Sequence, residues 1–322
     1  MKPLSECKVL VTPTSYGSQD PALKPFLEGQ VGEVVYNPTG KPLSEDLLID
    51  LLAGVDGYIA GLDHITAAVL HAAKGLQVVS RYGVGINNVD LEAAKANQIM
   101  VTNTPGANAR SVAELAVGLI LNLMRPILPA NTQTKNGEWP RFKGLSLEGK
   151  TIGLLGMGAI GKETAKRLAG FECKLLAFDI FEDTGFAKKY GITYLSLDEI
   201  ISQADVISLH LPGIPETTNM VNEDFLAKMK PGAILVNTAR GELVDEDALA
   251  NALSSGHLKG AGLDVFKQEP PGSDNPLLAF ENVIATPHMG AHSDSSTNAM
   301  GWNSTRDCLA VLKGEDPIYP VG

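Results

Sequence analysis

The segment KTIGLLGMGAIG, residues 150–161, decides the fold class. Its apolar start predicts a β-strand at residues 151–155, and residues 159–169 have the composition of a helix. Three glycines lie at the turn. Gly156 allows a tight turn, Gly158 lets the backbone approach a pyrophosphate, and Gly161 lets the helix pack close to the strand. A helix that begins here offers free N–H groups and the positive end of its dipole to that pyrophosphate.

A carboxylate follows the next predicted strand at a spacing typical of dinucleotide-binding domains. Asp179 closes the strand at residues 175–178, 18 residues beyond the last glycine, and a ribose ligand is expected after about 20 residues. Its oxygens suit a 2′-hydroxyl and repel a 2′-phosphate. Because Glu182 and Asp183 follow and no basic residue comes directly after them, the sequence predicts NAD rather than NADP. The alternative is a doubly wound sheet with a purely structural glycine turn.

Short β-branched runs alternate with amphipathic stretches along the whole chain, which is typical of parallel α/β structure. The first series has predicted strands at residues 8–12, 31–36, 57–60, 77–80 and 99–102, and predicted helices at residues 44–52 and 66–73. A helix at residues 109–125 and a polar, irregular stretch to residue 149 come next. The second series adds strands at residues 174–178, 206–209, 234–237 and 260–264, and a helix at residues 293–312 closes the chain. We therefore expect two α/β units.

Composition excludes several classes of function. The 322 residues carry a formal net charge of −11, which argues against nucleic acid as a partner because phosphate binding needs clustered Lys and Arg. Residues 1–18 lack a secretory pattern, and the most apolar stretch, residues 113–124, is too short to span a bilayer. Cys7, Cys173 and Cys308 are scattered and lie in no activating motif. We expect a cytoplasmic protein without disulfides or a catalytic thiol.

Three ionisable residues follow strands of the second series, namely Arg240, Glu269 and His288. Ligands of open α/β sheets bind outside the carboxyl ends of the strands, where these side chains could converge. Their chemistry suits reduction of a 2-oxo acid. A histidine supplies the proton, a carboxylate orients the imidazole and favours its charged form, and a guanidinium holds the substrate. Each residue alone also fits a salt bridge, a solvated carboxylate or a turn.

Six segments together resemble the D-isomer-specific 2-hydroxyacid dehydrogenases, above all the phosphoglycerate dehydrogenase branch. They are RYGVGINNVDLEAA (81–94), VTNTPGANARSVAEL (101–115), GLLGMGAIGKE (153–163), VNTARGELVDEDAL (236–249), GAGLDVFKQEPP (260–271) and TPHMGAH (286–292). The resemblance implies two doubly wound parallel-sheet domains with a cleft between them. Residues 1–102 and 291–322 would form a flavodoxin-like substrate domain, and residues 103–290 a Rossmann NAD-binding domain.

The same resemblance implies the site residues. The catalytic residues would be Arg240, which binds substrate, His288, which transfers the proton, and Glu269, which pairs with His288. Substrate would also meet Arg81, Asn108 and the backbone N–H groups of Gly83, Val84 and Gly85. The cofactor would meet Gly156, Gly158, Ala159, Ile160, Gly161, Asp179, Leu211, Thr238, Ala239, Asp264, His288, Gly290 and Ala291. No metal is expected.

The resemblance implies 3-phosphoglycerate and 3-phosphohydroxypyruvate as the best substrate pair, a reaction of serine biosynthesis. Arg81 follows a predicted strand and would meet the phosphate, or else a neighbouring acid. Tyr82 stands where a small residue is usual, and Asn87 where Asp is common. We expect no C-terminal regulatory module. The alternatives are a glyoxylate/hydroxypyruvate reductase, another 2-hydroxyacid dehydrogenase, and, in a different class, an NAD(H)-sensing interaction protein similar to the corepressors of this family.

Other residues keep two interpretations. His210 lines the cofactor cleft or satisfies a turn, and His292 starts a helix. Trp139, with Arg141 and Lys143, belongs to an ordinary packed segment or to the edge of an active site. The predicted helix at residues 109–125 is apolar around most of its circumference and must be covered on most sides. Burial in its own domain would explain this, and the resemblance implies a homodimer.

Overall fold

The computed structural model describes residues 2–321 and divides into two compact units. Unit 1 joins the chain up to Asn108 with the chain from Ala291 onward, and unit 2 is Ala109–Gly290. Among the described residues no single helix is long and apolar enough to cross a membrane. One strongly bent pair, Ala109–Met124 with Ile127–Lys135, meets that test of length and composition only when the two helices are taken together.

Unit 1 is built on a sheet with the strand order β13-β5-β4-β3-β1-β2, parallel except for β13. Its strands are β1 (Lys8–Val11), β2 (Glu33–Tyr36), β3 (Gly57–Ala60), β4 (Val78–Arg81), β5 (Met100–Thr102) and β13 (Pro320–Val321). Its α-helices are α1 (Leu23–Glu28), α2 (Glu45–Leu51), α3 (Ala67–Ala72), α4 (Leu91–Ala96) and α12 (Asp294–Lys313). The order of β1 to β5 is that of flavodoxin-like folds, as predicted.

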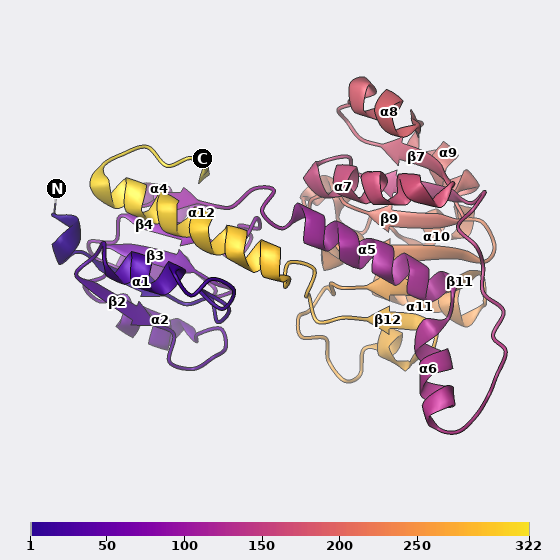
Figure 1. The fold of residues 1–322 in the computed structure, drawn as a ribbon, viewed down its shortest axis with the longest axis horizontal. Helices are drawn as coiled ribbons and strands as arrows, with labels where there is room; N and C mark the ends of the chain where they lie inside the picture. Colours follow the sequence, from indigo (N-terminus) through magenta and orange to yellow (C-terminus); the bar gives the residue numbers. More distant parts are fainter. Residues whose placement is uncertain (1, 322) are drawn as a thin grey trace. The chain divides into compact units, whose positions relative to one another are not determined.

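Both faces of this sheet are covered, because successive strand residues point to opposite sides. Val9 packs with α1 and α12, whereas Leu10 packs with α2, α3 and α4. Helix α12 lies along the sheet and contacts β3, β4 and β5 (Figure 1). A Cβ on Gly57 would lie 2.8 Å from the Cys308 sulfur, so this glycine lets the closing helix approach β3.

Unit 2 is built on a fully parallel sheet with the order β12-β11-β10-β9-β6-β7-β8. Its strands are β6 (Thr151–Leu155), β7 (Lys174–Phe178), β8 (Ile192–Tyr194), β9 (Val206–Leu209), β10 (Ala233–Asn237), β11 (Leu258–Leu263) and β12 (Val283–Ala285). Its α-helices are α5 (Ala109–Met124), α6 (Ile127–Lys135), α7 (Ala159–Leu168), α8 (Thr184–Tyr190), α9 (Leu197–Gln203), α10 (Glu223–Lys228) and α11 (Glu246–Ser254). Chain order reverses between β6 and β9, which is where such sheets bind ligands.

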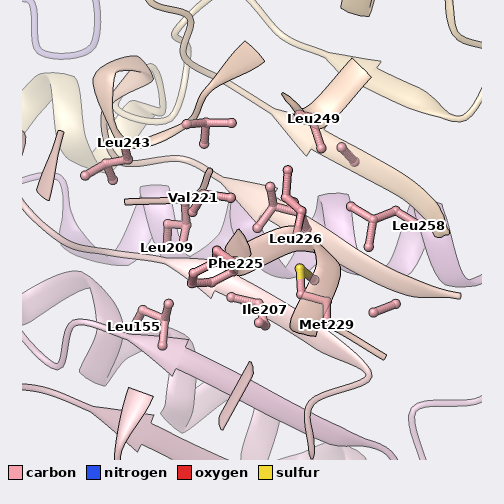
Figure 2. Packing of buried hydrophobic residues seen from close by; sticks show 14 of the residues in the cluster. Leu155, Ile207, Leu209, Val221, Phe225, Leu226, Met229, Leu243, Leu249 and Leu258 are labelled. Atoms are coloured by element: carbon pink, nitrogen blue, oxygen red, sulfur yellow. The ribbon is translucent and has the colours of Figure 1, made fainter. Parts of the chain in front are cut away.

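The two faces of the second sheet carry separate cores. Helices α9, α10 and α11 cover one face, where Leu209, Val221 and Phe225 pack together (Figure 2). Helices α5 and α7 lie side by side over the other face (Figure 1). The prediction of two doubly wound parallel-sheet domains is confirmed.

One expectation needs correction in this region. The stretch after residue 125 is not irregular throughout, because α6 occupies Ile127–Lys135. This helix has no buried residue, so its sequence lacks the apolar stripe that predicts a helix. Helix α5 is largely covered within unit 2, where Val112, Ala116 and Ile120 are buried. Its apolar character alone therefore does not require a second subunit.

Candidate active site

The glycine turn after β6 has the shape of a pyrophosphate cradle. Gly156 has a φ of 98°, and a Cβ there would lie 2.6 Å from the carbonyl oxygen of His210. A Cβ on Gly161 would lie 2.0 Å from the carbonyl oxygen of Gly156. Beside Gly158, in contrast, there is open space, and as N-cap of α7 it provides no side-chain cap. The first N–H groups of α7 are therefore suited to an anion.

Asp179 lies beside this turn, directly after β7. Its carboxylate accepts hydrogen bonds from the backbone N–H of Met157 (2.6 Å) and of Phe181 (2.9 Å). With Gly158 it lines an open pocket of about 520 Å³ within unit 2. Asp179, the residue predicted to bind the ribose, is thus hydrogen-bonded to the glycine turn.

Two buried polar atoms near the carboxyl ends of β9 and β10 have no hydrogen-bond partner among the described residues, namely Nδ1 of His210 and Oγ1 of Thr238. Burial lowers the pKa of His210 to about 4, so its ring is neutral at pH 7, and its Nε2 is 3.1 Å from the Ser208 hydroxyl. Buried polar atoms without partners indicate that a bound ligand supplies the missing hydrogen bonds. The turn, Asp179 and these atoms together fit a dinucleotide.

Glu269 and His288 form a close pair. The Glu269 carboxylate lies 2.6 Å from Nδ1 of His288, and its other oxygen accepts the N–H of Phe266 at 3.1 Å. Partial burial opposes ionisation of Glu269, but the His288 hydrogen bond and charge, the Phe266 N–H and the Arg240 charge outweigh it and lower the pKa of Glu269. The two side chains remain 37% and 44% exposed, so the pair is accessible for proton transfer.

The loop that carries His288 is fixed by Asp264, which is 1% exposed at the end of β11. Its carboxylate accepts hydrogen bonds from the Thr286 hydroxyl (2.6 Å) and from the N–H groups of Met289 (2.9 Å) and Gly290 (2.8 Å). His288 itself has a left-handed backbone (φ 50°), and its N–H donates to the Asp264 carbonyl at 2.8 Å. Asp264, predicted to contact the cofactor, thus also anchors this loop.

Arg240 follows β10, and Asn237 holds its backbone. The Asn237 side chain donates to the Arg240 carbonyl (2.8 Å) and accepts from the Ala239 N–H (3.0 Å). The guanidinium donates to the Ala239 carbonyl at 2.6 Å. A Cβ on Gly241 would lie 2.0 Å from the Phe266 carbonyl carbon, so this glycine lets the Arg240 loop pack against the Glu269 loop. Unit 2 therefore brings Arg240, Glu269 and His288 to one end of its sheet.

Hydrogen bonds to its carbonyl oxygens fix the loop 83–85 of unit 1, which is predicted to bind the substrate. The Gly83 carbonyl accepts from the Thr104 N–H (3.0 Å), and the Val84 carbonyl accepts from the Asn103 side chain (2.9 Å). In a trans peptide the N–H points away from the carbonyl of the same plane. The N–H groups of Val84 and Gly85 therefore face away from these partners, as an anion site requires. The Asn108 side-chain oxygen is buried and has no hydrogen-bond partner within residues 2–321.

Arg81 differs from the expectation. It is the last residue of β4 rather than a residue beyond it, and it is 4% exposed. Its guanidinium donates to the carbonyls of Ala60 (2.7 Å), Gly61 and Gly85 (3.2 Å). The neighbouring Tyr82 donates to the Thr297 carbonyl at 2.9 Å and so joins the loop to α12.

The remaining predicted residues fall into two groups. Leu211 and Ile160 are half-buried in unit 2, Ala239 is buried there, Ala159 is exposed, and Ala291 is half-buried at the start of the second segment of unit 1. Trp139 is 82% exposed, with Arg141 and Lys143 also exposed, and His292 directly precedes Ser293, the N-cap of α12. Burial raises the pKa of all three cysteine thiols, and residues 2–321 contain no cluster suited to a metal ion. Asn237 and Thr286 were not predicted, although both lie inside the quoted motifs.

Comparison with known proteins agrees with this geometry. Residues 117–290 match the model of the NAD binding domain of the D-isomer specific 2-hydroxyacid dehydrogenases. The chain is 43% identical over 253 residues to D-3-phosphoglycerate dehydrogenase of Mycobacterium bovis, covering 78% of this chain and 48% of that protein. It is 40% identical over 311 residues to the enzyme of that name from Homo sapiens, covering 96% of this chain and 57% of that protein.

The chain belongs to the D-isomer-specific 2-hydroxyacid dehydrogenase family. Its structure resembles the crystal structure of the TT0316 protein from Thermus thermophilus, with a TM-score of 0.88, 38% identity, and coverage of 98% of this chain and 100% of that chain. The predicted NAD-binding domain is confirmed. The chain spans about half the length of the two phosphoglycerate dehydrogenases.

Proposed function

We propose that the protein is an NAD-dependent dehydrogenase that interconverts a small D-2-hydroxy acid and its 2-oxo acid, with 3-phosphoglycerate and 3-phosphohydroxypyruvate as the preferred pair. The observation that carries the proposal is the 2.6 Å contact between Glu269 and Nδ1 of His288. A carboxylate on Nδ1 fixes the ring and leaves Nε2 for the substrate oxygen.

The roles of the residues follow from this contact. The reduced nicotinamide, when bound, supplies a hydride to the carbonyl carbon of the 2-oxo acid. His288 gives the proton on Nε2 to the carbonyl oxygen, and Glu269 stabilises the imidazolium before that transfer. Arg240 carries the positive charge that attracts the substrate carboxylate and polarises the carbonyl. In the oxidative direction His288 takes the proton back.

Unit 1 is assigned to substrate binding and unit 2 to the cofactor. The N–H groups of Val84 and Gly85, with Gly83 and Asn108, would hold the substrate carboxylate. Asp179 would accept a hydrogen bond from the adenosine ribose and repel a 2′-phosphate, which favours NAD. The glycine turn would hold the pyrophosphate, and Thr238, with the other predicted residues of unit 2, would hold the nicotinamide half.

The choice of substrate rests on the names of the relatives and on Arg81. A phosphate would have to compete with three backbone carbonyls for the Arg81 guanidinium, and charge-assisted, bidentate bonds to a dianion can do so. We expect higher kcat/KM for 3-phosphohydroxypyruvate than for hydroxypyruvate, and we expect Arg81→Lys to reduce this advantage. Equal values in the wild type would favour hydroxypyruvate, glyoxylate or another small 2-oxo acid.

The direct test is NADH oxidation followed at 340 nm with a panel of 2-oxo acids. Turnover of at least one acid that His288→Asn abolishes supports the dehydrogenase. Asn is the suitable replacement because it tolerates the left-handed backbone of position 288. Tight NADH binding without turnover of any acid would instead support the corepressor-like interaction protein.

Assembly as a homodimer in the cytoplasm is part of the proposal. Apolar side chains on α6 and the segment after it are exposed: Ile127 and Leu128 at 48%, Trp139 at 82% and Phe142 at 41%. A two-fold partner would cover them. Light scattering at micromolar concentration should give twice the 34.0 kDa of one chain, and the mass of one chain would contradict the dimer.

A further inference from the structure

The pocket beside the glycine turn has a charge pattern that Asp179 alone does not explain. Its lining residues are Met157, Gly158, Lys162, Asp179, Phe181, Glu182, Asp183 and Thr184. Three of these are acidic, and Lys162 is the basic residue among them. A ribose 2′-phosphate near Asp179 would need a cation, and Lys162 is the basic residue of this lining. The contacts of Lys162 therefore affect the choice between NAD and NADP.

Lys162 is already engaged by residues next to the pocket. Its ammonium group lies 2.6 Å from Oδ2 of Asp183 and 5.4 Å from the centre of the Phe186 ring. Asp183 is itself fixed, because its Oδ1 accepts the N–H of Phe186 at 2.9 Å as the N-cap of α8. Its own N–H donates to the Tyr194 hydroxyl at 3.2 Å. The lysine is thus held by a carboxylate that α8 keeps in place.

We propose that Asp183 is a second determinant of the preference for NAD over NADP: it sequesters Lys162 in an ion pair, so that the pocket offers no free cation to a ribose 2′-phosphate. The inference rests on the proposed function, because it presupposes that a dinucleotide binds here. Asp179 repels the phosphate directly, whereas Asp183 removes its counter-charge. The hydrogen bond from Lys162 is the largest influence that lowers the pKa of Asp183, which favours the charged carboxylate in this contact.

Asp183→Asn isolates this effect. The Asn oxygen can still accept the Phe186 N–H, and Asn is as good an N-cap as Asp, so α8 keeps its start. The amide nitrogen cannot accept from Lys162, which is then free for a phosphate. Glu182→Gln is the matched control, because it removes one negative charge from the same pocket without releasing the lysine. Asp183→Asn combined with Lys162→Met removes the released cation again.

The experiment measures Kd for NADH and for NADPH by isothermal titration calorimetry with the whole chain. Asp183→Asn should move the ratio of the two constants toward NADPH by about tenfold, the scale of one charge-assisted hydrogen bond. Glu182→Gln should move it by about threefold or less, because it changes only a screened, exposed charge. The double variant should return the ratio to that of the wild type or below.

The outcomes separate the inference from the function on which it rests. A wild type that binds neither dinucleotide would overturn the proposed function. A wild type that binds NADH, with an Asp183→Asn ratio unchanged, would overturn the inference alone. Two further results would overturn the inference: a shift of the ratio in Glu182→Gln as large as that in Asp183→Asn, or a shift that persists in the double variant. Either result would mean that the acidic residues repel the phosphate in general and that release of Lys162 is not the cause.

Discussion

Two carboxylates, one in each unit, follow a strand of their sheet but differ in their role. Asp63 in unit 1 is 1% exposed and accepts from the hydroxyls of Thr12 and Tyr58 (2.8 Å for Tyr58) and from the Leu43 N–H (2.7 Å). Glu269 in unit 2 is 37% exposed and pairs with a histidine.

The difference lies in the donors. Asp63 is satisfied by two hydroxyls and a backbone N–H, all of them neutral, so its bonds contribute to stability. Glu269 contacts the imidazole of His288, a group that can give or take a proton, and solvent reaches both partners. A saturated, buried carboxylate supports the fold, whereas a partly exposed carboxylate with one titratable partner can support chemistry.

The largest expected effect is loss of turnover on changing His288. His288→Asn should lower kcat by about 10²-fold or more, because the proton donor is lost, while Kd for NADH should change far less. Steady-state kinetics with the best 2-oxo acid and calorimetry with NADH measure both. Wild-type kcat in this variant would contradict the assignment and with it the contrast between the two carboxylates.

Asp63→Asn should show the reverse pattern. In the variant the amide nitrogen would face an N–H or O–H group that now donates to the carboxylate. The lost hydrogen bond should lower the free energy of unfolding by about 2 kcal/mol. Turnover should fall far less than in His288→Asn. Urea unfolding and the same kinetic assay measure the two quantities, and an unchanged unfolding midpoint would show that the Asp63 cluster does not support unit 1 as described.

Glu269→Gln should change the pH dependence more than the maximum rate. Without the carboxylate Nδ1 of His288 loses its charged partner, so the reduction rates of wild type and variant should differ above the folded-state pKa of Glu269 and converge as pH falls through it. Stability gives an independent check. The pKa of Glu269 is lowered below its ordinary value of 4.5, so its contribution is present above that pH and is lost as pH falls through the folded-state value. The unfolding free energies of wild type and variant should therefore converge in acid.

The smallest expected effect concerns Asp179, a carboxylate intermediate between the other two. It is half-buried and accepts two backbone N–H groups. Asp179→Asn keeps one of the two acceptor oxygens and removes the charge, so the NADPH-to-NADH affinity ratio should rise by about fivefold. A wild type that already prefers NADPH would contradict the cofactor prediction.

Much of the fold could be predicted because its signals are local. Strands such as β6 and β9 are continuous apolar runs, and the glycine turn carries its geometry in its spacing. Helix α6 could not be predicted, because it buries none of its residues and so leaves no periodic pattern. The short strands β8 and β13 were missed, whereas the strand predicted before His288 is β12. A strand of only two or three residues gives a weak pattern.

The candidate site was predictable in its residues more than in their contacts. The motifs indicated Arg240, Glu269 and His288, and the structure places them at one end of the sheet of unit 2. The burial of Arg81 depends on the carbonyls of Ala60 and Gly61, a strand away in sequence. Spacing carries no information on such a contact. The same holds for the ion pair of Lys162 with Asp183, which are 21 residues apart.

The loop of Gly83, Val84 and Gly85 presents main chain rather than side chains to its proposed anion. Almost any point mutation leaves an N–H in place, since only proline removes it. In that role the N–H groups of Val84 and Gly85 would be little affected by mutation, whereas the side chains around them could vary. A lineage that holds this loop can exchange one 2-oxo acid for another without losing its hold on the carboxylate.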